Sequence, residues 1–207
     1  MASNYAALAF GDQSKALQEQ YGSREFYARM EQQPARGLTK RETDFIQNRD
    51  SFYLASIGEN GFPYIQHRGG PKGFLHLTDP MTLAFADFRG NKQYISAGNV
   101  ITHPEVSLFL MDYSKQIRLK IYATAEILDV EDDPDLFAEI LPEGYQNATE
   151  RVVLLHVLAY DWNCPKYIVP RYTAEEINET LIPLQEKIKR LEAEISQLKD
   201  DALRQQG

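Results

Sequence analysis

Apolar and polar residues are arranged in three different ways along the chain, and each arrangement predicts a different kind of structure. In residues 1–48, apolar side chains lie among charged and glutamine residues, which predicts helices. Gly22 disfavours one long helix in this region. Thr39 followed by Glu42 has the spacing of a capping box, so we expect a short helix to begin directly after Thr39.

Residues 49–172 contain short runs of aromatic and aliphatic side chains separated by turn signals. Residues 51–57 lead to Asn60-Gly61, a pair that tolerates positive φ and is typical of a β-hairpin, and residues 62–68 form the returning strand. Short helices or turns are expected from residue 93 to 99 and from 133 to 140. This pattern predicts a mainly β, α+β fold built on a six-stranded antiparallel barrel. Further strand-like runs lie at 73–77, 82–88, 106–112, 118–130 and 152–159.

Residues 173–207 change to a heptad pattern, in which apolar positions recur at alternating spacings of four and three residues. Thr173 with Glu176 caps the start of this long helix, and Pro183 predicts a kink or a restart. Two interpretations remain open: a coiled coil that pairs two chains, or an amphipathic helix folded back on its own barrel. The strict spacing favours self-association. The apolar positions are Ile177, Leu181, Leu184, Ile188, Leu191, Ile195, Leu198 and Ala202.

Composition adds limits on the partners of the protein. The chain has 207 residues, with 22 Lys and Arg against 30 Asp and Glu, and its net charge is −8. Such an acidic chain argues against binding of the nucleic-acid backbone, although a local basic pocket for one phosphate is compatible with it. No stretch approaches the roughly 18 apolar residues of a membrane helix, and the first residues do not resemble a secretory signal. We therefore expect a soluble cytoplasmic protein that does not interact with membranes.

The residue types that carry most enzymatic chemistry are sparse. Cys164 is the one cysteine, which excludes an internal disulfide and a multi-cysteine zinc site. A nucleophilic role for this thiol is conceivable, but a small packed residue is the simpler interpretation. The four histidines lack the spacing of a helical metal pair, so no metal site is expected. The chain also lacks a serine elbow, a P-loop and a dinucleotide glycine fingerprint.

Basic residues near two strand ends are the most informative feature. Arg68 ends one predicted strand, and Arg89 and Lys92 follow another, with the amides of Asn91 and Gln93 beside them. Converging Arg and Lys side chains would bind a phosphomonoester, because guanidinium binds phosphate oxygens in pairs and Lys adds a point charge. The alternative is a set of solvated cations at strand ends.

In this segment the chain resembles the pyridoxamine 5′-phosphate oxidase-like flavoproteins, which have an FMN-binding split β-barrel. The resemblance covers about residues 25–172, and its motifs are specific in combination. It implies an FMN-binding split barrel, and with the patterns above it divides the chain into N-terminal helices at 1–48, a six-stranded antiparallel split barrel at 49–172 and a C-terminal helix at 173–207 that the vitamin-forming enzymes lack. The matching pieces are GFPYIQHRGGPKGFL, LAFADFRGNKQYISAGNVITHPEVSLFLMDY, RLKIYATAEIL and YDWNCPKYIVPRY.

The resemblance further implies a homodimer with two FMN sites at the subunit interface. One strand runs along the flavin and its phosphate tail, the next lies beside the ring, and the following segment holds the phosphate. A polar side chain faces the flavin from a later strand, and a C-terminal segment reaches the cofactor of the other subunit. In that order, the implied residues are Gln66, His67 and Arg68; Ala86 and Asp87; Asn91, Lys92 and Gln93; Arg118; and Trp162, Asn163 and Arg171.

Two departures from the vitamin-forming oxidases affect the expected activity. Gly90-Asn91-Lys92 stands where those enzymes have a basic pair after a small residue. Residues 133–140 are acidic where those enzymes bind the substrate phosphate, so oxidation of pyridoxine phosphate is not expected.

The leading hypothesis is an FMN-dependent oxidoreductase that acts on a small organic substrate or on reduced nicotinamide. The alternatives are a non-catalytic module that binds flavin or haem, and an interaction protein that assembles through its coiled coil.

Overall fold

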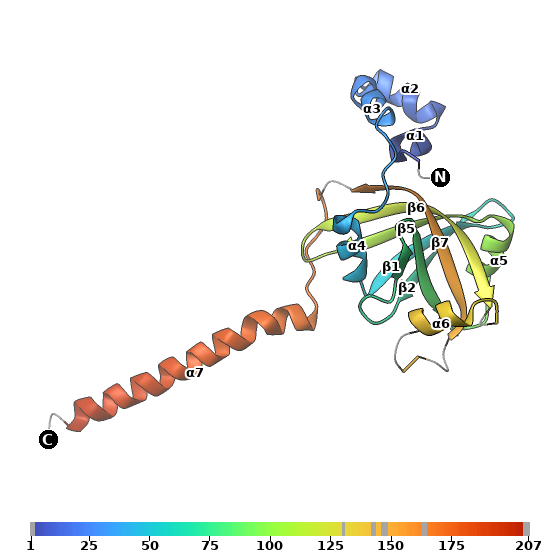
Figure 1. The fold of residues 1–207 in the computed structure, drawn as a ribbon. Coiled ribbons are helices and arrows are strands. Elements are labelled where there is room, and N and C mark those ends of the chain that lie inside the picture. Colours follow the sequence, from blue (N-terminus) through green and yellow to red (C-terminus); the bar gives the residue numbers. More distant parts are fainter. Residues whose placement is uncertain (1–2, 130, 142–143, 146–148, 163–164, 205–207) are drawn as a thin grey trace. The chain divides into compact units, whose positions relative to one another are not determined.

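The computed structural model describes residues 3–129, 131–141, 144–145, 149–162 and 165–204. The chain divides into two compact units, which are described separately. The barrel unit comprises Met1–Asp112 with Gln116–Tyr167, and the C-terminal unit comprises Tyr113–Lys115 with Ile168–Gly207. Figure 1 shows the elements of both units.

The barrel unit is built on one antiparallel sheet of seven strands, in the order β2-β1-β5-β6-β7-β4-β3. The antiparallel barrel is confirmed, but it has one strand more than the six expected, because all seven strand-like runs of the sequence form strands. The third run is displaced toward the C-terminus, to His76–Asp79. The strands are β1 (Ser51–Ile57), β2 (Pro63–Gly69), β3 (His76–Asp79), β4 (Thr82–Phe88), β5 (Glu105–Asp112), β6 (Ile117–Asp129) and β7 (Thr149–Trp162).

The core lies inside the curled sheet. In β1 and β5 alternate side chains are buried, so Phe52, Leu54, Leu108 and Leu110 face inward at 1% exposure or less. Strand β4 differs, because its residues are buried on both faces from Thr82 to Ala86 and beyond. Its second face packs in a smaller apolar cluster that includes residues of β7 and of helix α6.

Helices precede and connect the strands of the barrel unit. The capping box at Thr39 and Glu42 is present as predicted, and α4 buries Ile46 in the core. Gly22 has a positive φ of 73° between α2 and α3, which separates the two helices. The helices are α1 (Tyr5–Ala9), α2 (Asp12–Gln20), α3 (Arg24–Glu31), α4 (Lys40–Gln47), α5 (Ile95–Thr102) and α6 (Pro134–Ile140).

The C-terminal unit contains α7 (Ala174–Arg204), the longest helix of the described chain. Its predicted cap is confirmed: the Glu176 N–H donates to Thr173 Oγ1, and the Thr173 N–H donates to the Glu176 carboxylate. The helix continues through Pro183, so the restart expected there does not occur. None of the described helices has the length and apolar character needed to cross a membrane.

Candidate functional site

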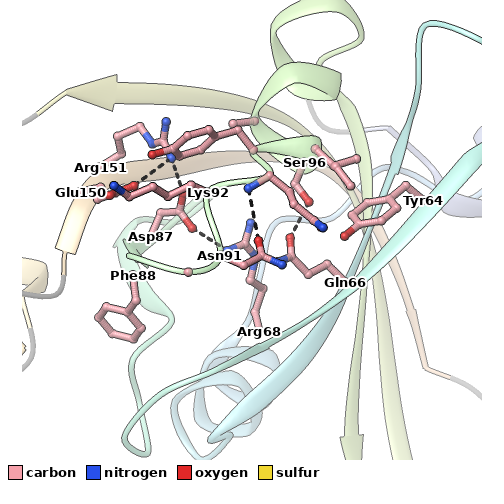
Figure 2. A pocket seen from close by; sticks show the side chains of 15 residues that line it. Tyr64, Gln66, Arg68, Asp87, Phe88, Asn91, Lys92, Ser96, Glu150 and Arg151 are labelled. Atoms are coloured by element: carbon pink, nitrogen blue, oxygen red, sulfur yellow. Dashed lines mark hydrogen bonds and ion pairs between the residues drawn. The ribbon is translucent and has the colours of Figure 1, made fainter.

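A polar hollow lies between β2 and β4 of the curled sheet (Figure 2). Strands β2 and β4 stand first and sixth in the sheet order, yet side chains from both line this hollow. The start of α5, the residues before it and the start of β7 complete the wall. The hollow holds about 90 Å³, against about 300–1,000 Å³ for a complete small-molecule site. It can therefore hold a phosphate-sized group, but not a whole nucleotide.

Asp87 organises the charged side chains of this hollow. Its Oδ1 lies 2.5 Å from Arg68 Nη1, and its Oδ2 lies 3.3 Å from Arg151 Nη2. The second contact follows from the sheet, because Asp87 and Arg151 are directly paired in the register of β4 and β7. Figure 2 shows the carboxylate joined to both guanidinium groups. The carboxylate therefore fixes two arginines that come from strands on opposite sides of the barrel opening.

The two arginines retain unused donors. The Nε atoms of Arg68 and Arg151 are buried and have no hydrogen-bond partner among the described residues. Buried donors are usually satisfied, so an unpaired donor at a polar hollow indicates a missing acceptor. Lys92 adds an exposed ammonium group at the same hollow, with no ion-pair partner in the described part of the chain. These three cations face two carboxylates, Asp87 and Glu150.

Glu150 pairs with two arginine side chains. One of its carboxylate oxygens lies 3.1 Å from Arg89 Nε, and the other lies 3.5 Å from Arg151 Nη2. Arg89 is 59% exposed at its side chain and does not line the hollow. The sequence-based expectation that Arg89 converges with Arg68 and Lys92 is therefore not what the structure shows; its role is to pair with Glu150.

The segment before α5 has an unusual backbone. Lys92 and Tyr94 have positive φ values of 60° and 53°, a region that costs energy for residues other than glycine. Tyr94 is the N-cap residue of α5 and provides no side-chain cap. The first residues of α5 line the hollow, where the helix dipole contributes partial positive charge. Ser96 Oγ donates to Gln66 Oε1 at 2.6 Å and ties the helix to β2.

A second hollow of about 150 Å³ adjoins the first along the same two strands. It is lined by His67 and Ala86, and it shares Arg68 and Phe88 with the first hollow. The His67 ring lies edge-on to Tyr53, with 5.6 Å between ring centroids. The structure thus brings together eight of the residues implied by the resemblance. Gln66, Arg68, Asp87, Asn91, Lys92 and Gln93 line the first hollow, and His67 and Ala86 line the second.

Of the other implied residues, Arg118, Trp162 and Arg171 line neither hollow of a single chain. Arg118 lies over the Phe109 ring at 5.9 Å, and its buried Nε has no partner among the described residues. Arg171 belongs to the C-terminal unit, where its guanidinium lies 4.9 Å from the Tyr113 ring centroid. Trp162 contacts residues of α4 instead. Asn163 lies outside the described residues. Their predicted roles toward a partner's cofactor remain predictions.

Trp162 belongs to a separate network beside α4. Its indole N–H donates to Glu42 Oε1 at 2.6 Å, and the Arg41 guanidinium lies 4.4 Å above its ring. Burial raises the pKa of Glu42, but hydrogen bonds from Thr39 and Trp162 outweigh it and hold this pKa below the ordinary value. Another hollow, of about 270 Å³, is lined by these side chains and by Asp161. Burial raises the pKa of Asp161, against the attraction of Lys120.

Arg151 and Glu150 are the site residues that sequence analysis missed. Both directly precede the apolar run at 152–159, so the predicted strand stopped short of them. A charged pair at the start of a predicted strand could have indicated a site there. However, only the pairing of β4 with β7 places Arg151 opposite Asp87. Among the described residues, no group of three or more His, Cys, Asp or Glu side chains is arranged to hold a metal ion.

The antiparallel split barrel, with basic side chains at its opening, defines the class of protein. Residues 38–160 match the family described as pyridoxamine 5′-phosphate oxidase, and this match covers more than half of the chain. The chain therefore belongs to the pyridoxamine 5′-phosphate oxidase family. A search of curated proteins found no match.

Solved structures similar to this chain come from several bacteria. A candidate pyridoxamine 5′-phosphate oxidase of Lactobacillus delbrueckii is 24% identical over 60% of this chain and 93% of its own, with a TM-score of 0.47. HupZ of Group A Streptococcus is 16% identical over 65% and 99%, with a TM-score of 0.48. An F420 reductase is 12% identical over 60% and 98%, with a TM-score of 0.45.

Proposed function

We propose that this protein binds FMN and acts as an FMN-dependent oxidoreductase on a small organic substrate or on reduced nicotinamide. One observation carries the proposal: Asp87 holds Arg68 and Arg151 at a hollow of phosphate size, and both arginines keep a buried, unpaired Nε donor among the described residues. Lys92 and the start of α5 add positive charge at the same place. This donor set suits a phosphomonoester better than a neutral ligand.

The second hollow provides space beside the first hollow for the part of FMN that lies beyond its phosphate. His67 and Ala86 line it, and it continues from the first hollow along β2 and β4. FMN supplies two-electron redox chemistry when it is bound. The protein's own residues bind the phosphate through Arg68, Arg151 and Lys92, and orient the cofactor against the two strands.

We further propose that two copies of the chain complete the site. The first hollow alone holds about 90 Å³, so most of a nucleotide would lie outside it and needs another surface. Family membership supports a homodimer with FMN at the subunit interface. In such a dimer Arg118, Trp162, Asn163 and Arg171 are the residues that we expect to serve the cofactor together with the partner's strands.

We also propose that pyridoxine phosphate is not the substrate of this chain, on electrostatic grounds. Helix α6 begins with the Asp133 cap, carries Asp135 in its first turn and includes Glu139. These carboxylates would repel a substrate phosphate at the segment where vitamin-forming oxidases bind it. A phosphorylated vitamin is therefore a poor substrate for this chain.

The visible absorbance of the purified protein tests the cofactor and its redox function in one sample. We expect a flavin spectrum after incubation with FMN, and bleaching of that spectrum when NADH or NADPH is added without oxygen. Bleaching by only one of the two nucleotides would identify the donor. A protein that stays colourless after incubation with FMN would contradict FMN binding, and a bound flavin that neither nucleotide nor small organic donors reduce would contradict the oxidoreductase activity.

A further inference from the structure

Helix α7 presents an apolar stripe whose side chains are exposed in a single chain. The alternating spacing assigns Ile188 and Ile195 to heptad position a, and the leucines of the stripe between 184 and 198 to position d. These side chains are 43–63% exposed: Leu184, Ile188, Leu191, Ile195 and Leu198. In parallel coiled coils, β-branched residues at a with leucine at d favour two strands. The stripe therefore fits a second copy of the same helix.

The charged residues beside the stripe are complementary between two such copies. Lys187 and Glu194 occupy position g, and Glu192 and Lys199 occupy position e of the heptads that follow. In a parallel, in-register pair, each g residue lies beside the e residue five positions later on the other chain. Lys187 then faces Glu192, and Glu194 faces Lys199. Both contacts occur twice because of the two-fold symmetry, so all four interchain pairs are attractive.

We propose that α7 forms a parallel, in-register, two-stranded coiled coil with α7 of a second copy of this chain. An antiparallel pair places g beside g and e beside e, which retains the attraction of Lys187 to Glu194 but sets Glu192 beside Gln185, a neutral residue. In the antiparallel pair each isoleucine at position a also packs against a leucine at position d of the other helix. The layers of isoleucine with isoleucine and of leucine with leucine, which favour two parallel strands, are then lost. Charge and side-chain shape therefore both favour the parallel orientation.

A parallel pair has a consequence for the barrels. In each chain the barrel precedes α7, so parallel helices bring the two barrels to the same end of the coiled coil. Tethering raises the effective concentration of one barrel toward the other, to the millimolar range for short connections. Such tethering would favour formation of the proposed cofactor sites between the two barrels. This consequence rests on the proposed function, whereas the coiled coil itself does not.

Cysteine cross-linking of the full-length chain tests the proposal without using flavin. In a Cys164→Ser background, Leu198→Cys places a thiol at a d position, and the matched control Ala193→Cys places one at position f, on the outer face. We expect disulfide-linked dimers to form at least about tenfold faster for Leu198→Cys, because only there can the two Cα atoms approach within about 7 Å. Equal cross-linking rates for the two variants would contradict the coiled coil. Absence of cross-linking in both variants would also contradict it, and is the result expected for a helix folded on its own barrel.

A mixture of two cysteine variants tests whether the two copies of α7 are parallel or antiparallel. Leu181→Cys and size-tagged Leu198→Cys are mixed and oxidised. An antiparallel coil would bring these two positions together, whereas a parallel coil separates them by about 25 Å at 1.5 Å per residue. The proposal predicts dimers that each contain one variant, and abundant mixed cross-links would contradict the parallel orientation.

Charge reversal tests the register. In the Leu198→Cys chain, Lys187→Glu places a carboxylate opposite Glu192 of the other copy and should slow cross-linking several-fold, and adding Glu192→Lys should restore the rate. Lys189→Glu reverses a charge at the outward b position and should leave the rate unchanged. Slowing that the second substitution fails to restore would contradict the in-register pairing. Failure of these tests leaves FMN binding unaffected, so the two proposals fail separately.

Discussion

Arg68 on the end strand β2 pairs with Asp87 on β4, the strand next to the other end of the sheet, with 2.5 Å between Nη1 and Oδ1. Their own strands, β2 and β4, are separated in the sheet order by β1, β5, β6 and β7. The ion pair can form only because the sheet curls until β2 lies near β4. The pair is also largely buried, with side-chain exposures of 15% and 11%. One contact therefore closes the barrel opening and sets the orientation of the proposed phosphate site.

Asp87→Asn should destabilise the protein before any ligand is added. The substitution leaves Arg68 without a counter-ion among the described residues and Arg151 with Glu150 alone, at 3.5 Å. Loss of one partner from a largely buried ion pair costs about 3 kcal/mol or more. The free energy of unfolding from urea titration measures this loss. FMN or inorganic phosphate should then raise the melting temperature more in the variant than in the wild type, because the anion replaces the lost charge. An unchanged unfolding free energy would show that the carboxylate has no structural role.

Arg68→Ala should weaken FMN binding. It removes a charge-assisted contact to the phosphate, which corresponds to roughly a 10- to 100-fold rise in Kd. Quenching of flavin fluorescence measures the affinity. The matched control is Arg29→Ala, which removes an exposed arginine that pairs with Glu25 on α3 and should leave Kd unchanged. Equal affinities of Arg68→Ala and the wild type would remove this arginine from the phosphate site.

Lys92→Gly should separate backbone strain from ligand binding. Glycine relieves the positive φ at this position and should stabilise the protein by up to about 1 kcal/mol. Loss of the ammonium group should raise the Kd for FMN, by up to roughly tenfold. Thermal unfolding and flavin titration measure the two effects. A variant with unchanged affinity would place Lys92 outside the binding site, whatever its stability.

Glu42→Gln should change the acid sensitivity of the protein. The pKa of Glu42 is held below its ordinary value in the folded chain, because hydrogen bonds from Thr39 and Trp162 outweigh the opposing effect of burial. Its contribution to stability is thus fully present above the ordinary glutamate pKa of about 4.3 and is lost as the pH falls through the lower folded value.

The wild type should therefore exceed Glu42→Gln in unfolding free energy by about 1–3 kcal/mol at pH 7, and the difference should shrink below about pH 4. Urea titrations at several pH values measure both curves. Asp44→Asn, on the exposed face of the same helix, is the control and should follow the wild type. A difference that is constant with pH would show that the charge of Glu42 is not involved.

Most of the fold was predictable because local patterns determine it. Short apolar runs bounded by turn signals located β1 and β5, and Thr39 with Glu42 located the start of α4. The count of strands was wrong by one, because the sequence contains seven strand-like runs and all of them form strands, the third displaced to His76–Asp79. Of the kink or restart expected at Pro183, the restart does not occur, because α7 is one helix from Ala174 to Arg204.

The site was predictable only in part, for a physical reason. Arg68 and Lys92 stand out as basic residues at strand ends, and the resemblance added Asp87. Arg151 joins them through the register between β4 and β7, which no local pattern encodes. Closure of the barrel is likewise a long-range property, and it alone brings β2 beside β4. Long-range pairing therefore decides which of the predicted cations share a ligand.

Titration of the purified protein with FMN and with riboflavin isolates the contribution of the phosphate group to binding. The two ligands differ only by this phosphate, which we assign to the hollow formed around Arg68, Asp87 and Arg151. The assignment predicts that FMN binds at least about 100-fold more tightly, which corresponds to two or more charge-assisted contacts. Equal affinity for both flavins, or binding of neither, would contradict it.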